Sequence, residues 1–264
     1  MAQIPVLVAC RDRLTPLLSL VAWLERAGCQ RILLIDNDSV YPPLLEYFDE
    51  TPHTVIKLRA NVGPTHFWDH GIVSGNVRNE RYIVTDPDVV PDDDCPLDAI
   101  DRFGELLDRY PNCVKVGFGL RIDDLPNRYR HADAVRAYEG AFWKDELENG
   151  VYSAAIDTTF SLYHQGVSEY LRSPAIRTGF PYVARHLPWY ADLSHPTNEE
   201  AYYHRRYLRE RQSTAGIRTN WNDQRLPRDI AVQLGLSAPR SRRIWARGAR
   251  YVRNGFRKTG YSGY

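Results

Sequence analysis

Two aspartates separated by one proline follow a short apolar segment in the first half of the chain. Residues 82–94 read YIVTDPDVVPDDD, so Asp86 and Asp88 come directly after YIVT. In an extended chain alternate side chains share a face, and we expect the two carboxylates to lie close together. Pro87 disfavours helix at Asp86, so the segment cannot relax by coiling. A divalent cation such as Mg2+ or Mn2+ would stabilise this pair and could bridge it to a phosphate.

The same stretch also fits a structural role, in which Asp92–Asp94 form an acidic turn that caps the next helix. The Asp86–Asp88 spacing taken alone does not separate these interpretations, because so short a motif is common. The elements around the pair must therefore decide between them.

Length and composition indicate an ordinary globular protein. The chain has 264 residues, enough for one large α/β domain or for a domain with an elaborated second half. Its four cysteines, Cys10, Cys29, Cys95 and Cys113, form no CxxC pair and are expected to be reduced thiols. We find no apolar run of about 20 residues and no signal peptide, which together predict a cytoplasmic protein.

The net charge of +1 conceals a basic tail. Residues 237–264 carry eight basic side chains and no acid, which leaves 26 basic and 33 acidic residues in 1–236. Within 237–258, four apolar side chains fall on one helical face among arginines, a pattern typical of peripheral binding to an anionic membrane. Nucleic acid is the less favoured partner, and a solvated tail without a partner is the alternative.

The apolar segments alternate between strand and helix character. We expect strands at 4–10, 31–35, 54–58, 82–85 and 114–122, and helices at 15–27, 43–48, 65–78 and 96–110. This order predicts an α/β fold with a doubly wound, mostly parallel sheet. Ligands of such sheets bind beyond the carboxyl ends of the strands.

Those carboxyl ends are polar and lack glycine-rich loops. They carry Arg11 to Arg13, Asp36 to Asp38, Arg59 with Asn61, and Asp86 with Asp88. Neither a GxGxxG loop nor a Walker-type loop is present. The phosphates of a nucleotide would then be held by side chains and a cation, which favours the metal interpretation of the aspartate pair.

Three short motifs in successive strand–helix units carry a resemblance. With IDNDS at 35–39, NVG at 61–63 and TDPD at 85–88, the chain resembles nucleotide-sugar-dependent glycosyltransferases of the GT-A fold, close to the family 2 type. The resemblance covers about residues 4–125 and implies a nucleotide-sugar-binding half at 1–125.

The resemblance implies roles for individual residues of that half. Asp36 would contact the base or ribose, Asp86 the ribose and the metal, and Asp88 the metal, which would be Mn2+ or Mg2+. Arg11 and Asn61, at neighbouring strand ends, are expected to join the nucleotide-sugar-binding set.

The second half, 126–236, would then bind the acceptor and supply the catalytic base. Asp157 interrupts the β-prone run VYSAAIDTTFSLY, where an unpaired charge is costly. The resemblance implies that Asp157 accepts the proton of a saccharide or lipid-linked acceptor in an inverting transfer, as in the synthesis of cell-surface polysaccharide or glycolipid. The alternative is a structural aspartate bonded to backbone amides or to Thr158 and Thr159.

Residues 177–190 supply the last candidates. Among the eight histidines His186 is best placed to be a further metal ligand, and a packing role is its alternative. Trp189 and Tyr190 could stack on an acceptor sugar, although core packing is the commoner role for an aromatic residue.

Three rival functions share parts of this pattern. Residues 86–90 satisfy the DxDx[TV] pattern of haloacid-dehalogenase-type phosphatases, but those enzymes place it after their first strand. Sugar nucleotidyltransferases need a glycine-rich loop after the first strand, which residues 9–16 do not provide. A catalytically inactive sugar- or nucleotide-binding module would retain much the same sequence.

Overall fold

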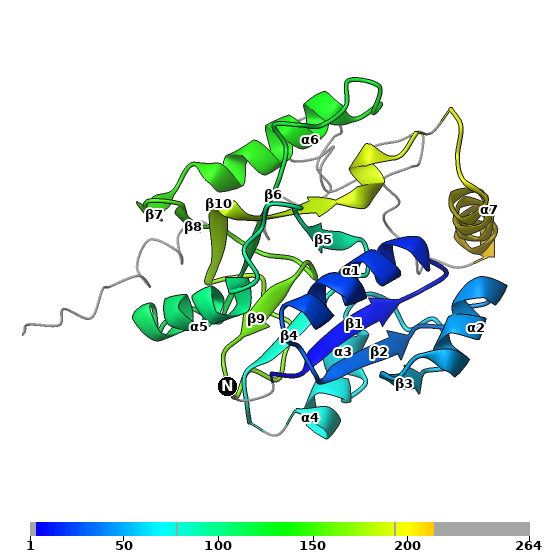
Figure 1. The fold of residues 1–264 in the computed structure, drawn as a ribbon, viewed down its shortest axis with the longest axis horizontal. Coiled ribbons are helices and arrows are strands. Elements are labelled where there is room, and N and C mark those ends of the chain that lie inside the picture. Colours follow the sequence, from blue (N-terminus) through cyan, green and yellow to red (C-terminus); the bar gives the residue numbers. More distant parts are fainter. Residues whose placement is uncertain (1–3, 78, 193, 214–264) are drawn as a thin grey trace, which may run out of the picture.

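A computed structural model describes residues 4–77, 79–192 and 194–213 of the chain (Figure 1). The predicted basic tail, 237–264, lies outside the described residues, as does the end of the predicted acceptor half. In the part that is described, we find no helix both long and apolar enough to cross a membrane.

The centre of the molecule is a ten-stranded sheet, with the order β3-β2-β1-β4-β9-β6-β10-β8-β7 and with β5 also paired to β10. The strands are β1 (Val6–Cys10), β2 (Ile32–Asp36), β3 (Thr54–Lys57), β4 (Tyr82–Thr85), β5 (Val89–Pro91), β6 (Lys115–Leu120), β7 (Glu146–Glu148), β8 (Val151–Ser153), β9 (Ser161–Tyr163) and β10 (Ala175–His186).

Seven of these ten strands run in one direction, which confirms the predicted α/β class. Strands β3, β2, β1 and β4 are parallel neighbours, and β6 is parallel to β10. Three strands run the other way: β9 lies antiparallel between β4 and β6, and β8 and β5 both lie antiparallel to β10. The insertion of β9 makes the predicted halves 1–125 and 126–236 contribute to one continuous sheet.

Helices cover both faces of the sheet. They are α1 (Thr15–Arg26), α2 (Pro42–Glu50), α3 (His66–Asp69), α4 (Ile72–Asn76), α5 (Ala99–Arg109), α6 (Ala132–Glu139) and α7 (Asn198–Ser213), with short 3-10 helices at Gly140–Trp143 and Leu187–Tyr190.

Strand alternation divides the core into two clusters. Along β1, Val6 and Val8 face the cluster that includes the apolar side chains of α1 and α5, whereas Leu7 faces the cluster that includes those of α3 and α4. Both faces of β1 are therefore buried, which explains why its sequence is a continuous apolar run rather than an alternating one.

Two predicted elements differ from the structure. The helix expected at 65–78 is two short helices, α3 and α4, because Gly71 between them adopts the left-handed conformation with φ of 70°. The β-prone run at 151–163 is only strand at its ends, β8 and β9, and residues 154–160 between them have no regular structure. The five strands predicted in the first half, β1 to β4 and β6, fall within about two residues of their predicted positions, whereas β5, β7 and β10 were not predicted.

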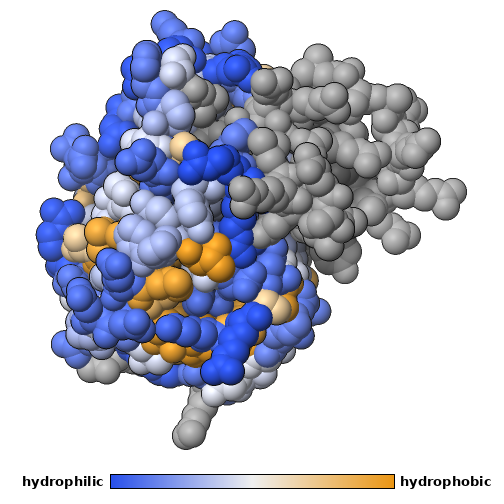
Figure 2. All heavy atoms as spheres, turned by 90° about the vertical axis from the view of Figure 1, so that its right-hand side faces the viewer, coloured by the Kyte–Doolittle hydropathy of each residue, from blue (hydrophilic) through white to orange (hydrophobic). Residues whose placement is uncertain are grey.

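Strand β3 forms one edge of the sheet, beside α2 and below α7 in the view of Figure 1. Its terminal residues, Thr54 and Lys57, are exposed and polar, which disfavours pairing with another chain. Figure 2 shows this side of the molecule, where apolar side chains gather within a mostly hydrophilic face.

Gly117 in β6 provides a test of the close packing between β6 and β9. A Cβ at Gly117 would lie 2.3 Å from the backbone oxygen of Phe160 and 2.8 Å from the Cβ of Ser161, so Gly117→Ala forces β9 away from β6. We expect a loss of about 2–3 kcal/mol in unfolding free energy, measured by urea denaturation. Gly75→Ala in α4 is the control, because its Cβ meets nothing within 4 Å and should add about 0.5–1 kcal/mol. Equal stability of the two variants would contradict the β6–β9 pairing.

Candidate functional site

The polar ends of three adjacent strands meet at one edge of the sheet. β1 lies between β2 and β4 and is parallel to both, so the residues after these three strands are neighbours (Figure 1). The chain turns sharply after β1, β2 and β3: Asp12, Asp38 and Arg59 have left-handed φ angles of 51°, 69° and 59°. Non-glycine residues rarely adopt this conformation, and it concentrates at functional sites.

Asp86 lies at the centre of this edge and contacts the second half of the chain. Its Oδ2 accepts a hydrogen bond of 2.7 Å from the hydroxyl of Thr158. Burial, together with the nearby Asp88 carboxylate, raises the pKa of Asp86 to about 8, and the Thr158 hydrogen bond opposes this shift. Asp86 and Asp88 are therefore close enough to interact. They lie in a turn between β4 and β5 rather than on one face of an extended strand, as the sequence had suggested.

Asp88 lies between two basic side chains. Its Oδ2 is 3.3 Å from a guanidinium nitrogen of Arg13, and its Oδ1 is 3.9 Å from Nε2 of His186. The antiparallel pairing of β5 with β10 sets His186 opposite Val89, and the N–H of Leu187 bonds to the Asp88 carbonyl at 2.9 Å. The structure thus brings together Asp88 and His186, which are nearly a hundred residues apart.

The donor atoms at this point suit a divalent cation. Burial lowers the pKa of His186 to about 4; Asp88 opposes this shift and Arg13 adds to it, so the imidazole is neutral near pH 7 and able to bind a metal. Within 4–77, 79–192 and 194–213, no three His, Cys, Asp or Glu side chains form a complete metal cluster. Asp88 and His186 fit as two ligands, while Oδ2 of Asp86 is engaged with Thr158.

Asp157 lies in the irregular connection between β8 and β9 rather than in a buried strand. Its side chain is 49% exposed, although the apolar run around it had suggested a buried position. The hydroxyl of Tyr170 donates to Oδ1, and a guanidinium nitrogen of Arg172 lies 3.8 Å from Oδ2. The Asp157 carboxylate is near enough to Asp86 to help raise its pKa, and about half of its side chain is exposed.

The remaining residues that the sequence predicted to bind a nucleotide sugar lie along the same edge. Oδ1 of Asp36 accepts the N–H of Ser39 at 2.8 Å, so this carboxylate also shapes its own turn. Asn37 holds the loop that contains Asn61, since its amide donates to the Gly63 carbonyl at 3.2 Å and accepts the N–H of Val62 at 2.9 Å. Arg11 is half-buried after β1, and Asn61 is exposed.

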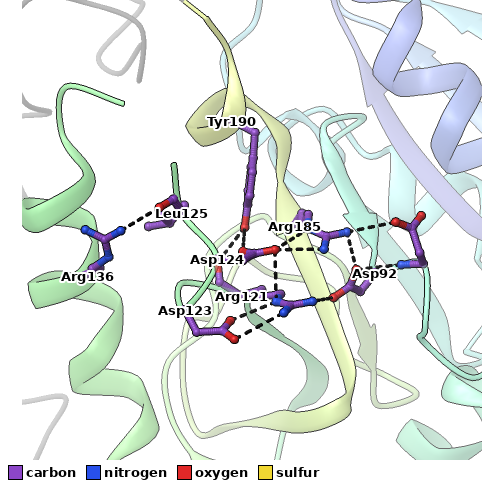
Figure 3. A network of polar contacts seen from close by, with 9 residues as sticks. Asp92, Arg121, Asp123, Asp124, Leu125, Arg136, Arg185 and Tyr190 are labelled. Atoms are coloured by element: carbon purple, nitrogen blue, oxygen red, sulfur yellow. Dashed lines mark hydrogen bonds and ion pairs between the residues drawn. The ribbon is translucent and has the colours of Figure 1, made fainter. Parts of the chain in front are cut away.

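The two aromatic candidates for acceptor binding are engaged elsewhere. Trp189 is only 1% exposed and packs in the main core against the ring of His186, with centroids 4.7 Å apart, so it offers no open face for a sugar. The hydroxyl of Tyr190 donates to Asp124 at 2.5 Å within a network in which Asp92 and Asp124 bind Arg185 (Figure 3). In this structure both residues stabilise the strand that carries His186.

Helix α7 covers the ends of β1 and β2. A guanidinium nitrogen of Arg206 lies 2.7 Å from Oδ2 of Asp12, and another lies 2.8 Å from Oδ2 of Asp38. The ring of Tyr203 lies 4.2 Å from the guanidinium carbon of Arg13. These contacts fix the loops after β1 and β2 with ionic and aromatic interactions.

The same helix also caps α1. The residue before α1 is Leu14, which has no capping side chain, and Thr15 is the first helical residue. A carboxylate oxygen of Glu199 accepts the backbone N–H groups of Leu14 at 3.1 Å and Thr15 at 3.0 Å. A negative charge at a helix N-terminus is favourable, so α7 supplies the missing cap.

Sequence reasoning missed Tyr170, Lys115 and the whole of α7, and it considered Thr158 only as a partner of Asp157. Lys115 had a signal, because it is a charged residue within the apolar strand sequence VKVGFGL. Its ammonium group donates to the Asp157 carbonyl at 2.9 Å. Helix α7 has no apolar stripe that would have revealed it, since its described contacts are mostly polar.

Comparison with known proteins gives weak structural similarities. No protein-family model matches the chain, and no match was found among curated protein sequences. Among solved structures, S. aureus TarS 1–349 aligns with 61% of this chain at 11% identity and a TM-score of 0.38, and the aligned region spans only 46% of the TarS chain.

Two further solved structures are similar at the same level. HddC from Yersinia pseudotuberculosis, complexed with GMP-PN, aligns with 67% of this chain and 84% of its own, with 13% identity and a TM-score of 0.37. A UDP-glucose pyrophosphorylase complexed with UDP-glucose aligns with 66% of this chain and 74% of its own, with 14% identity and a TM-score of 0.35. Similarities of this size do not assign an activity.

The contact between Arg206 and Asp12 can be tested by mutation. Asp12 is 1% exposed, so Arg206→Ala leaves its carboxylate buried without its cation and should lower the unfolding free energy by about 1–3 kcal/mol. The adjacent Arg205 is exposed, and Arg205→Ala should change stability by less than about 0.5 kcal/mol. Urea denaturation measures both variants. If Arg206→Ala proves as stable as Arg205→Ala, α7 is not held by this ion pair.

Proposed function

We propose that the protein is a metal-dependent glycosyltransferase that moves a sugar from a nucleotide-diphosphate sugar to an acceptor hydroxyl. The observation that carries this proposal is the hydrogen bond from Thr158 to Asp86. It brings the half-exposed Asp157 next to the Asp86–Asp88 pair at the carboxyl edge of the sheet, where ligands of α/β proteins bind. A candidate base thus lies beside a candidate diphosphate site.

The transfer step uses these groups as follows. The acceptor oxygen forms a bond to the anomeric carbon of the donor sugar, and the bond from that carbon to the diphosphate oxygen breaks. The hydroxyl proton passes to a carboxylate oxygen of Asp157, which acts as the general base. The electron pair of the broken bond leaves with the nucleoside diphosphate. Attack on the face opposite the leaving group would invert the configuration.

The leaving diphosphate needs positive charge around it. Arg13 supplies a guanidinium group beside Asp88, 3.3 Å from its carboxylate. Asp88 and His186 would hold Mn2+ or Mg2+, which when bound would neutralise negative charge on the diphosphate. Asp36, Arg11 and Asn61 lie farther along the same edge, where they would contact the nucleoside. The acceptor would be a saccharide or a lipid-linked saccharide that approaches from the side of Asp157.

Asp88→Asn tests the diphosphate side of the site. The substitution removes the negative charge that would hold the cation. The assay measures release of nucleoside diphosphate, with Mn2+, from the donor that a panel of nucleotide sugars identifies as preferred. We expect the rate of release to fall at least 100-fold. Calorimetry should also show weaker nucleotide binding. Asp94→Asn is the matched control, because Asp94 is exposed in the same acidic region. Transfer by wild-type protein that is insensitive to EDTA would refute the metal requirement.

Asp157→Asn tests the base. A positioned general base typically contributes about 100- to 10,000-fold, so transfer should fall by at least 100-fold while nucleotide affinity stays within a factor of about three. Glu169→Gln, at an exposed carboxylate of the segment after β9, should behave as wild type. Equal losses of nucleotide binding in Asp157→Asn and Asp88→Asn would overturn this division of roles. Release of inorganic phosphate instead of a nucleoside diphosphate would indicate a phosphatase, and no product would indicate a binding module.

A further inference from the structure

Lys115 is a charged residue at the centre of the sheet. It lies in β6, opposite Tyr163 of β9 on one side and Ala175 of β10 on the other, and it is fully buried. Lysine is almost never fully buried unless its ammonium group has specific partners, because removing the charge from water is costly. The contacts of Lys115 should therefore reveal why the charge is there.

The ammonium group points toward the segment that carries Asp157. Nζ donates to the backbone carbonyl of Asp157 at 2.9 Å and to the hydroxyl of Tyr163 at 2.8 Å. It also lies 4.7 Å from the ring centroid of Tyr163 and 5.6 Å from that of Tyr170, whose hydroxyl donates to the Asp157 carboxylate. Lys115 thus contacts Asp157 directly through the backbone and indirectly through Tyr170.

The Asp157 segment depends on such contacts, because residues 154–160 have no regular structure. A second buried cation, Arg177, donates to the Ala155 carbonyl at 3.0 Å. Arg177 is neutralised by Glu139 at 2.6 Å, and both side chains are 4% exposed. Lys115, in contrast, donates its two hydrogen bonds to uncharged oxygens. Among the described residues, no directly bonded carboxylate neutralises its positive charge, so the electric field of this charge reaches Asp157.

The charged and neutral forms of Lys115 are close in free energy near neutral pH. Burial lowers the pKa of Lys115 to about 7; Asp157 opposes this shift, and two arginines add to it. The titratable and charged groups that face Lys115 are Asp157, Arg172, Arg177, Cys113, Tyr163 and Tyr170. Of these, Asp157 is the anion that favours the charged lysine most, so the two side chains are coupled electrostatically.

We propose that Lys115 is a positioning residue for Asp157, holding the backbone of its segment and placing a positive charge beneath its carboxylate. This inference rests on the proposed role of Asp157 as the base. A methionine would fill a similar volume without a charge or a donor, so packing alone does not require a lysine at this position. The amine contributes the hydrogen bond to the Asp157 carbonyl and the electrostatic coupling.

The coupling can be measured without any assay of transfer. The chain has four lysines, at 57, 115, 144 and 258, so protein labelled with 13C at lysine Cε should give four NMR signals, and Lys115→Met assigns one of them. We expect the Lys115 signal of the full-length protein to titrate near neutral pH. Asp157→Asn should move its midpoint to lower pH, because the anion that favours the charged lysine is lost. Glu169→Gln should leave the midpoint in place.

Activity provides the second arm of the test. Lys115→Met should lower kcat by at least tenfold while nucleotide affinity stays within a factor of three, because the base and not the donor site is disturbed. Tyr163→Phe removes one hydrogen-bond partner of Lys115 and covers the case in which Lys115→Met does not fold; we expect a smaller fall in kcat of about threefold. A purely structural lysine would change stability without separating kcat from donor binding.

The positioning role of Lys115 and the proposed transferase function can fail separately. A Lys115 midpoint that Asp157→Asn does not move, or wild-type kcat in both Lys115→Met and Tyr163→Phe, would overturn the positioning role. If the wild-type protein transfers no sugar, the proposed function fails, and the NMR arm still decides whether the two side chains are coupled.

Discussion

The hydrogen bond between Thr158 and Asp86 joins positions 72 residues apart and defines the geometry of the whole site. It exists because β9 lies between β4 and β6, which directs the connection from β8 across the carboxyl end of β4. This bond holds the carboxylate of Asp86 at the sheet edge. It also restricts the position of Asp157, because Asp157 directly precedes Thr158 in the chain. If β9 were displaced, Asp157 would lose its position relative to Asp86 and Asp88.

Several buried carboxylates of the molecule are paired with arginine. The carboxylates of Asp12, Glu139 and Asp92 are all nearly buried, and each contacts at least one guanidinium group. A guanidinium group can donate several hydrogen bonds in fixed directions, which suits carboxylates that have little access to water. Lys115 departs from this pattern, because the hydrogen-bond partners of its ammonium group are a carbonyl and a phenol rather than a carboxylate.

The strand and helix order could be predicted from the sequence because the apolar segments are short, well separated and bounded by proline, glycine or acidic residues. The same logic placed Asp36, Asp86 and Asp88 at strand ends, since it needs only the direction of parallel strands. Helix 65–78 was predicted as one element because the left-handed conformation of Gly71 is a local choice that periodicity does not reveal.

The contacts of the candidate site depended on pairings that the sequence does not encode locally. His186 reaches Asp88 through the antiparallel pairing of β5 with β10. Strand β5 has only three residues, which is too short for its sequence to predict a strand. The same strand β10 carries the chain to Trp189, which therefore enters the core rather than the surface. Asp157 was identified by its apolar surroundings, yet it is half-exposed because residues 154–160 leave the sheet. Helix α7 docks through charges, and amphipathic periodicity does not detect such a helix.

The interleaved strand order has a consequence for how the chain holds together. A fragment ending at residue 125 would contain β4 and β6 but neither β9 nor β10, so one edge of β4 and both edges of β6 would be left unpaired. Such a fragment would be prone to aggregate rather than to fold as an independent nucleotide-binding module. The segments before and after residue 125 are thus obliged to fold as one cooperative unit, and a ligand bound to either segment would protect both from proteolysis.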